Sequence, residues 1–236
     1  EDNFNLSNNS ISNINYNINV EEDATIRHNI FQNFANSNKL YLTSNTVCEK
    51  NSSYSQNTYN FSDGFVRNFH HVKLNGEFSN ASLKGCFFLK DKNICSNKTN
   101  IKHNAENCIS DQTYKGILND HSKANYYSNT FVSENAQKTE GYQLSKGILL
   151  TDNCSFFSKP ELRIFADDVK CSHGSTIGPV DESALYYLRS RGISKNEAMK
   201  MIISSFIEED LQNLDKNIAE RVSKNLSDYL TNLVNE

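Results

Sequence analysis

Short apolar clusters recur between polar stretches over the first three quarters of the chain, and several of them alternate apolar and polar positions with a period of two. No convincing helical periodicity interrupts them, so the pattern predicts many short β-strands joined by polar turns. A sandwich, a barrel and a β-solenoid all fit, and the irregular intervals leave the choice open. The clusters are Tyr16/Ile18/Val20, Leu40/Leu42, Tyr59/Phe61, Val72/Leu74, 87–89, Ile117/Leu118, Phe131/Val132, 148–150 and Ile164/Phe165.

The turn residues narrow this choice. The chain has nine glycines and two prolines, and hairpin-rich sandwiches usually place more glycine in their turns, so the composition weakly favours a β-helix. Asparagine is abundant, above all in the first sixty residues. Asparagine suits turns, and stacked asparagine side chains can form ladders in repetitive β-structures. The favoured explanation, however, is the codon bias of an AT-rich genome.

The pattern changes near Gly178 and Pro179, which predicts a β-domain over residues 1–178 and a helical domain over residues 179–236. Asp181 is expected to be the N-cap of the first helix, and Gly192 is expected to follow its last turn. Ser194 and Glu197 have the spacing of a capping box at the start of the next helix.

An apolar stripe at steps of three and four follows the capping box. It predicts either a helical pair, or a contact with another subunit, or a lid that closes the end of the β-domain. The stripe consists of Ala198, Met201, Ile202, Phe206, Leu211, Leu214, Ile218, Val222, Leu226, Tyr229/Leu230 and Leu233.

Composition excludes several classes of protein. The formal net charge of -4 and the pI of about 5.9 give no electrostatic signal for a nucleic-acid partner. No apolar run approaches the roughly 18 residues of a membrane span, so no membrane partner is expected. Six cysteines are scattered without a CxxC motif, which favours a reducing compartment. The chain begins at Glu1 rather than Met, so an upstream segment is expected to have been lost.

One candidate metal-ligating pair stands out. Cys171 and His173 lie two residues apart in a predicted strand, so their side chains project from the same face, roughly 7 Å apart. Thiolate and imidazole suit iron, iron–sulfur clusters, zinc or copper. A closed metal centre needs about four protein ligands, so the pair predicts half a site or none.

Other constellations are weaker. Asp167 and Asp168 are adjacent and would point to opposite faces of a strand, whereas a glycoside hydrolase needs two carboxyl groups directed at one bond. Cys171 lacks the local signature of a cysteine protease nucleophile. Four further histidines show no metal-ligand spacing among themselves and are interpreted as surface or satisfied core residues: His70, His71, His103 and His121. No P-loop is present, so the chain is not expected to hydrolyse ATP.

The run from Lys159 to Gly174, with its Cys-Ser-His-Gly ending, resembles the SufD branch of the SufB/SufD family, which are scaffolds of the Suf iron–sulfur assembly machinery. The resemblance is strongest from about His103 to Leu211, and the family's N-terminal helical domain is absent. Further matching segments are Tyr114-Lys-Gly-Ile-Leu118, 137–139, 149–152 and Tyr187-Leu-Arg-Ser-Arg-Gly192.

The resemblance implies a mainly β fold with α: a right-handed parallel β-helix core followed by a C-terminal helical domain. It implies a non-catalytic scaffold that pairs with SufB through the β-helix. A transient iron–sulfur cluster would be shared with SufB, with none tightly bound in the isolated chain. His173 would contribute to the cluster site and Cys171 would support it.

The SufC ATPase would dock on the C-terminal helices. The residues expected at that contact are Tyr187, Leu188, Arg189, Arg191, Met201, Ile202 and Phe206. The resemblance and the asparagine-rich sequence suit the stroma of a plastid such as the apicoplast, with a bacterial cytoplasm as the alternative. A β-helix hydrolase acting on polysaccharides and a structural, homodimerising β-helix module remain the other interpretations.

Overall fold

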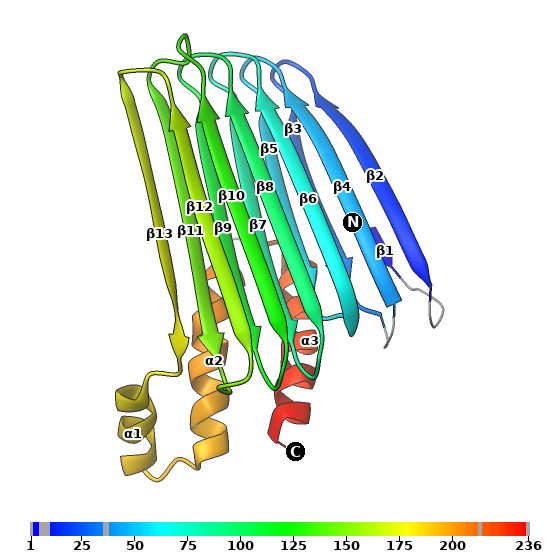
Figure 1. The fold of residues 1–236 in the computed structure, drawn as a ribbon, viewed down its shortest axis with the longest axis vertical. Helices are drawn as coiled ribbons and strands as arrows, with labels where there is room; N and C mark the ends of the chain where they lie inside the picture. Colours follow the sequence, from blue (N-terminus) through cyan, green and yellow to red (C-terminus); the bar gives the residue numbers. More distant parts are fainter. Residues whose placement is uncertain (1, 5–9, 35–37, 212–213, 235–236) are drawn as a thin grey trace.

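The chain forms a parallel β-solenoid with helices α2 and α3 on one side and α1 beyond the end of β13 (Figure 1). The structure, a computed structural model, describes residues 2–4, 10–34, 38–211 and 214–234. The strands are β1 (Asp2–Phe4), β2 (Ile11–Val20), β3 (Thr25–Gln32), β4 (Asn38–Cys48), β5 (Ser53–Asn60), β6 (Gly64–Leu74), β7 (Asn80–Leu89), β8 (Ile94–His103), β9 (Ile109–Leu118), β10 (Lys123–Val132), β11 (Thr139–Leu149), β12 (Ser155–Ile164) and β13 (Val169–Pro179).

Odd-numbered and even-numbered strands form two separate sheets. Sheet A has the order β1-β3-β5-β7-β9-β11-β13, sheet B has the order β12-β10-β8-β6-β4-β2, and every pair is parallel. The chain therefore alternates between the sheets and gains one strand in each per turn. This confirms the predicted β-helix class and excludes the sandwich and the barrel.

The turns of the solenoid explain why so few glycines suffice. Among the residues that the structure describes, seven non-glycine residues have positive φ, and five of them are Asn or Asp, the residues that tolerate the left-handed region best. At one end of the strands their backbone N–H groups donate to the next turn, as from Asp23 to Lys50 (3.0 Å) and from Asn51 to Glu77 (2.9 Å). The coil length varies from 26 residues (Asn38 to Gly64) to 32 residues (Lys123 to Ser155), so the sequence shows no fixed repeat.

The core lies between the two sheets and mixes apolar with polar side chains. Leu40, Leu83 and Ile101 are fully buried there, and buried amides bridge the coils, as from Gln32 Nε2 to Asn68 Oδ1 (2.7 Å). Strands β3 and β8, which the apolar clusters did not predict, contribute such polar positions.

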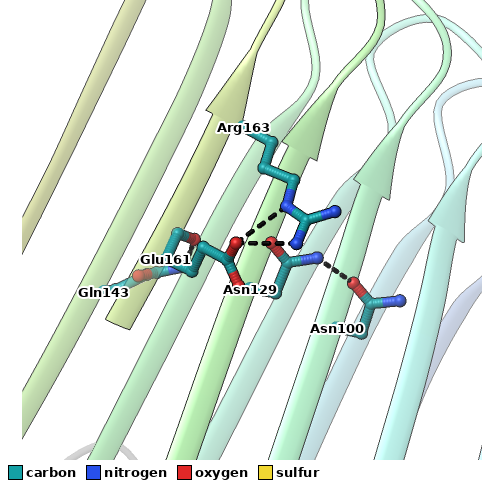
Figure 2. Close-up of polar contacts among 5 residues, drawn as sticks. All are labelled: Asn100, Asn129, Gln143, Glu161 and Arg163. Atoms are coloured by element: carbon teal, nitrogen blue, oxygen red, sulfur yellow. Dashed lines mark hydrogen bonds and ion pairs between the residues drawn. The ribbon is translucent and has the colours of Figure 1, made fainter. Parts of the chain in front are cut away.

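Asparagines also stack on the outer face of sheet B. Asn17, Asn45, His71, Asn100 and Asn129 occupy one row across five strands. Within it, Asn129 Nδ2 donates to Asn100 Oδ1 (2.6 Å; Figure 2). Asn45 Nδ2 donates to Asn17 Oδ1 (3.3 Å). Whatever its codon origin, part of the asparagine content therefore forms a side-chain ladder between coils.

The first helix, α1 (Glu182–Ser190), has the predicted ends. Asp181 accepts hydrogen bonds from the backbone N–H groups of Ser183 (2.8 Å) and Ala184 (3.3 Å). Gly192 follows the helix with φ of +87°. The capping box before α2 (Lys195–Leu211) is also confirmed, because Ser194 Oγ accepts from the Glu197 N–H (3.3 Å).

Helices α2 and α3 (Lys216–Val234) pack against the outer face of sheet A. The predicted stripe of α3 is confirmed by buried Ile218, Val222 and Leu226, whereas the side chain of Leu233 lies outside those described. For α2 the predicted stripe is right only in part: Ala198 is buried as expected, but Ile203 and Ile207 are the other buried residues and Met201 is 49% exposed. The helices thus form a layer on one face rather than a lid at the end of the solenoid. No helix in the described ranges is long and apolar enough to cross a membrane.

Candidate functional site at the open end of the solenoid

The last coil leaves both sheets with an unpaired edge. Within the described residues, β12 pairs only with β10 and β13 pairs only with β11. Pro160 lies in β12, which is consistent with an edge position because proline lacks the N–H that a central strand donates. Side chains of this coil that point inward have no further coil above them, so they line an open mouth.

Cys171 and His173 both belong to the inward-facing row of β13. They lie opposite Gly141 and Gln143 of β11, and the inward direction is fixed by Ser175 of the same row, whose Oγ accepts from Ser145 Oγ (2.9 Å). Cys171 and His173 thus share one face, as their spacing predicted. The His173 side chain is exposed, and no described residue makes a hydrogen bond to its ring.

Cys171 is more enclosed. It packs against the small apolar cluster of Val132, Ala136 and Ala166, and a methyl group placed on Gly141 would lie 3.3 Å from its Sγ. This burial raises the pKa of the Cys171 thiol, although a backbone hydrogen bond from Gly141 opposes the shift. At neutral pH the side chain is therefore mostly a protonated thiol, and it can ligate a metal only after it loses its proton.

A polar layer lies beneath His173. Gln143 Nε2 donates to Thr130 Oγ1 (2.8 Å) and to the backbone carbonyl of Glu161 (3.2 Å), and Gln112 Nε2 donates to the same Thr130 hydroxyl (2.8 Å). Figure 2 shows Gln143 beside β12, and its side chain links β11 of sheet A to β12, the last strand of sheet B. Sequence reasoning did not single out this layer, because its members are distant in the chain and meet only when the coils stack.

The mouth does not hold a complete metal site. Among the described residues, no group of three or more His, Cys, Asp and Glu side chains lies close enough together to hold a metal ion. Cys171 and His173 remain two potential ligands at an edge that a second protein can reach.

The two adjacent carboxylates considered for a glycoside hydrolase lie outside the strands. Asp167 and Asp168 lie in the bend before β13 rather than in a strand, and the Asp168 carbonyl accepts from the Lys138 N–H (2.6 Å). The prediction that they lie in a strand and point to opposite faces was therefore wrong. They form the turn of the last coil.

The four histidines interpreted as satisfied core or surface residues lie in the core or at the surface, but Nε2 of His70 and Nδ1 of His103 are buried without a hydrogen-bond partner in the described part of the chain. His70 is buried beside Ser44 Oγ (2.9 Å) and His103 beside Ser110 Oγ (2.9 Å). Burial lowers their pKa values to about 3 and about 4. His71 joins the outer ladder through Asn100 (2.8 Å), and His121 is exposed in a turn.

The helix residues expected at a partner contact differ in accessibility. Tyr187 and Met201 are 58% and 49% exposed, and the Arg191 guanidinium lies 5.3 Å from the Tyr187 ring centre. Arg189 is also exposed, whereas Leu188 and Ile202 are half-buried. Phe206 packs toward sheet A, with the Lys115 ammonium 5.3 Å from its ring centre.

Comparison with known proteins gives consistent matches. A family model described as "SUF system FeS cluster assembly, SufBD core domain" matches residues 1–206. "Iron-sulfur cluster assembly protein SufD" of Escherichia coli is 37% identical over 138 residues, which are 58% of this chain and 33% of that protein. A protein of the same description from Plasmodium falciparum is 28% identical over 231 residues, 93% of this chain and 15% of that protein.

A plant relative, "Protein ABCI7, chloroplastic" of Arabidopsis thaliana, is 42% identical over 84 residues, 36% of this chain and 18% of that protein. The chain thus spans a third or less of the length of these relatives.

Proposed function

Because the chain belongs to the SufB/SufD family of iron–sulfur cluster assembly proteins, we propose that it acts as a SufD-type scaffold without catalytic activity of its own. The observation that carries the proposal is the Cys-Ser-His-Gly segment. Its Cys171 and His173 face inward at the open, unpaired end of a β-solenoid, where a second chain can supply further ligands.

The nascent cluster is the cargo of this scaffold. His173 contributes an imidazole ligand, and Cys171 supports it as a thiol that becomes a sulfur donor once it has lost its proton. SufB pairs through the edges of β12 and β13 and supplies the remaining ligands, so the cluster is shared and the isolated chain holds none tightly. This division agrees with the count of about four ligands that a closed metal centre needs.

SufC docks on the exposed side of α1 and α2, around Tyr187 and Met201. When SufC binds ATP and dimerises, it pulls on these helices. The layer of α2 and α3 on sheet A transmits that motion to the solenoid, and the mouth opens for iron and sulfide. The compartment is the stroma of a plastid, in agreement with the plant and Plasmodium relatives, or a bacterial cytoplasm, in agreement with the Escherichia coli relative.

The cluster role is tested with His173→Ala and, as a matched control, His121→Ala, which also removes an exposed imidazole. In cells that depend on this chain, His173→Ala is expected to abolish maturation of iron–sulfur client enzymes, while the control keeps it. Both variants should fold and co-purify with SufC. Normal client maturation with His173→Ala would disprove the ligand role.

The SufC contact is tested by co-purification with and without ATP. Met201→Glu places a charge in the exposed apolar part of α2 and is expected to reduce recovery of SufC at least about tenfold. Lys224→Glu, exposed on α3, is the control. Unchanged recovery with Met201→Glu would place the contact elsewhere, and glycan cleavage by the wild-type chain would favour the hydrolase instead.

A further inference from the structure

The outer face of sheet B is the large sheet face that the helices leave open. In Figure 1 its strands face the viewer, and no helix of the described chain crosses in front of them. Helices α2 and α3 pack on sheet A instead. The outward positions of sheet B follow from the burial alternation and the register of its strands.

This face has a charge opposite to that of the whole chain. Its outward positions include eight basic side chains and one acidic side chain, Glu161. The chain has 24 Lys and Arg and 28 Asp and Glu in total, which leaves 16 basic and 27 acidic residues elsewhere. The basic residues are Lys39, Arg67, Lys73, Lys98, Lys102, Lys123, Lys159 and Arg163.

The face neutralises little of its own charge. Glu161 pairs with Arg163 within the same strand, at 2.7 Å from Nη2 and 2.8 Å from Nε (Figure 2). No carboxylate of the described residues lies within ion-pair distance of the other seven basic groups. These cations are therefore available to an anionic partner.

A groove crosses this face perpendicular to the strands. It has a volume of about 600 Å³ and takes its lining from all six strands of sheet B, and its charged lining residues are the basic Arg67, Lys98 and Lys159 and the acidic Glu161. Five strand spacings amount to about 24 Å, which an extended polypeptide covers with about seven or eight residues. Asn13 and Thr43 add polar groups to the lining that can bond to the amides of such a peptide.

The aromatic side chains of the face argue for a peptide rather than single-stranded nucleic acid, which needs free ring faces for base stacking. The Lys98 ammonium lies over the Phe69 ring at 5.2 Å. Tyr127 lies against Phe157 at 5.8 Å between ring centres. These rings are already paired with a cation or with each other.

We propose that the outer face of sheet B is a docking surface for an extended, acidic segment of a partner protein. The cations of the groove attract its carboxylates, and the polar side chains hold its backbone. The proposal is independent of the cluster site, because the groove opens on the flat outer face while Cys171 and His173 face the interior of the solenoid.

The test measures fluorescence anisotropy of a labelled eight-residue peptide of alternating Glu and Val. The chain is titrated into the peptide at NaCl concentrations from about 20 mM to about 300 mM, because salt screens exposed charges. The Glu peptide is expected to bind and to weaken as salt rises, whereas the matched Gln/Val peptide does not bind. Equal binding of the two peptides, or binding of neither, overturns the proposal.

The double variant Lys98→Glu/Lys159→Glu tests whether the peptide binds at the outer face of sheet B. It is expected to weaken binding of the Glu peptide at least about tenfold, since two attractions become repulsions. The control Lys195→Glu/Lys224→Glu makes the same charge change on exposed helix residues and should stay within about twofold. Circular dichroism verifies that both variants fold. An equal loss of binding in both variants would show that binding follows the net charge of the chain, and it would overturn the proposal that the peptide binds on this face.

Two other occupants are outcomes of the same experiment. Tighter binding of an oligothymidine of matched length, lost in Lys98→Glu/Lys159→Glu, would assign the face to nucleic acid. A salt-sensitive homodimer, detected by sedimentation and abolished by the same variant, would assign it to a second copy of the chain. Either result overturns the proposal of an acidic partner segment.

Discussion

Replacing Lys115 by methionine is expected to loosen helix α2 from the solenoid. Lys115 lies on the outer face of β9 and is 3% exposed, and its ammonium is 2.7 Å from Asp210 Oδ2 on α2. The same ammonium donates to the carbonyl of Phe206 (2.9 Å) and lies over the Phe206 ring. The contact with Asp210 is a close electrostatic pairing beneath the helix layer, since its angles fall short of a hydrogen bond.

The expected magnitude follows from burial. Removing one partner of a buried ion pair costs about 3–5 kcal/mol, because the other charge stays desolvated. Asp210 retains 13% exposure and can reach water, so the lower end, about 3 kcal/mol, applies to Lys115→Met. Changing both partners, Lys115→Met with Asp210→Leu, is expected to recover most of that loss, to within about 1 kcal/mol of the wild type.

Hydrogen exchange of backbone amides measures this locally. A loss of about 3 kcal/mol corresponds to roughly a hundredfold faster exchange, and it should be confined to α2 and its contact with sheet A. Lys146→Met is the control, because Lys146 lies beside Lys115 in the register of β11. An effect of Lys115→Met below about 1 kcal/mol, or equal to that of Lys146→Met, would refute the reasoning.

Three further predictions concern the core and the mouth. Gly116→Ala should destabilise the chain by about 1–3 kcal/mol in urea unfolding, because the new methyl group would lie 2.2 Å from the Phe87 ring; an unchanged midpoint would contradict this. Burial lowers the pKa of His70 to about 3 and of His103 to about 4. Because the unfolded state then binds more protons, stability is complete above about pH 6.5 and falls on acidification, by up to about 4 kcal/mol at pH 5. Unfolding of wild type and His70→Gln at pH 7 and pH 5 measures this, and equal pH dependence would refute it. The thiol of Cys171 is the one cysteine thiol that is not buried, so iodoacetamide should alkylate it first. Its alkylation rate should reach half-maximum at a pH above the ordinary thiol pKa. Mass spectrometry, with Cys171→Ser as the control, measures the order in which the cysteines are alkylated, and another order would contradict the prediction.

Rows of buried polar side chains explain why the apolar clusters did not predict strands β3 and β8. Strand β8 buries Cys95, Asn97, Thr99, Ile101 and His103. Three of these five are polar, so a window along the chain detects no apolar alternation. A solenoid accepts these residues because each polar side chain finds its partner one coil away, as Asn68 Nδ2 does with Asn97 Oδ1 (2.9 Å). The hydrogen-bond partner is about one coil distant in sequence, so it is invisible to local patterns.

The α2 stripe was predicted only in part for a related reason. Ala198, Met201, Ile202 and Phe206 all had suitable spacing, but which apolar side of a helix is buried depends on where it lands on sheet A. The buried ion pair of Lys115 and Asp210 helps to fix that position. Helix ends were predictable because caps are local: the Asp181 side chain and the left-handed Gly192 act within three residues of the helix.

By itself, the sequence determined the elements whose physics is local. It specified period-two strands, the change to helix after Pro179, both ends of α1, the capping box of α2, and a thiol and an imidazole on one face of a strand. The tertiary structure alone decided which rows meet. Stacking of coils placed Cys171 and His173 at an unpaired edge, put Gln143 beneath His173, and gathered eight scattered basic residues on one sheet face. Such groupings depend on register between strands about thirty residues apart, and only the folded solenoid sets that register.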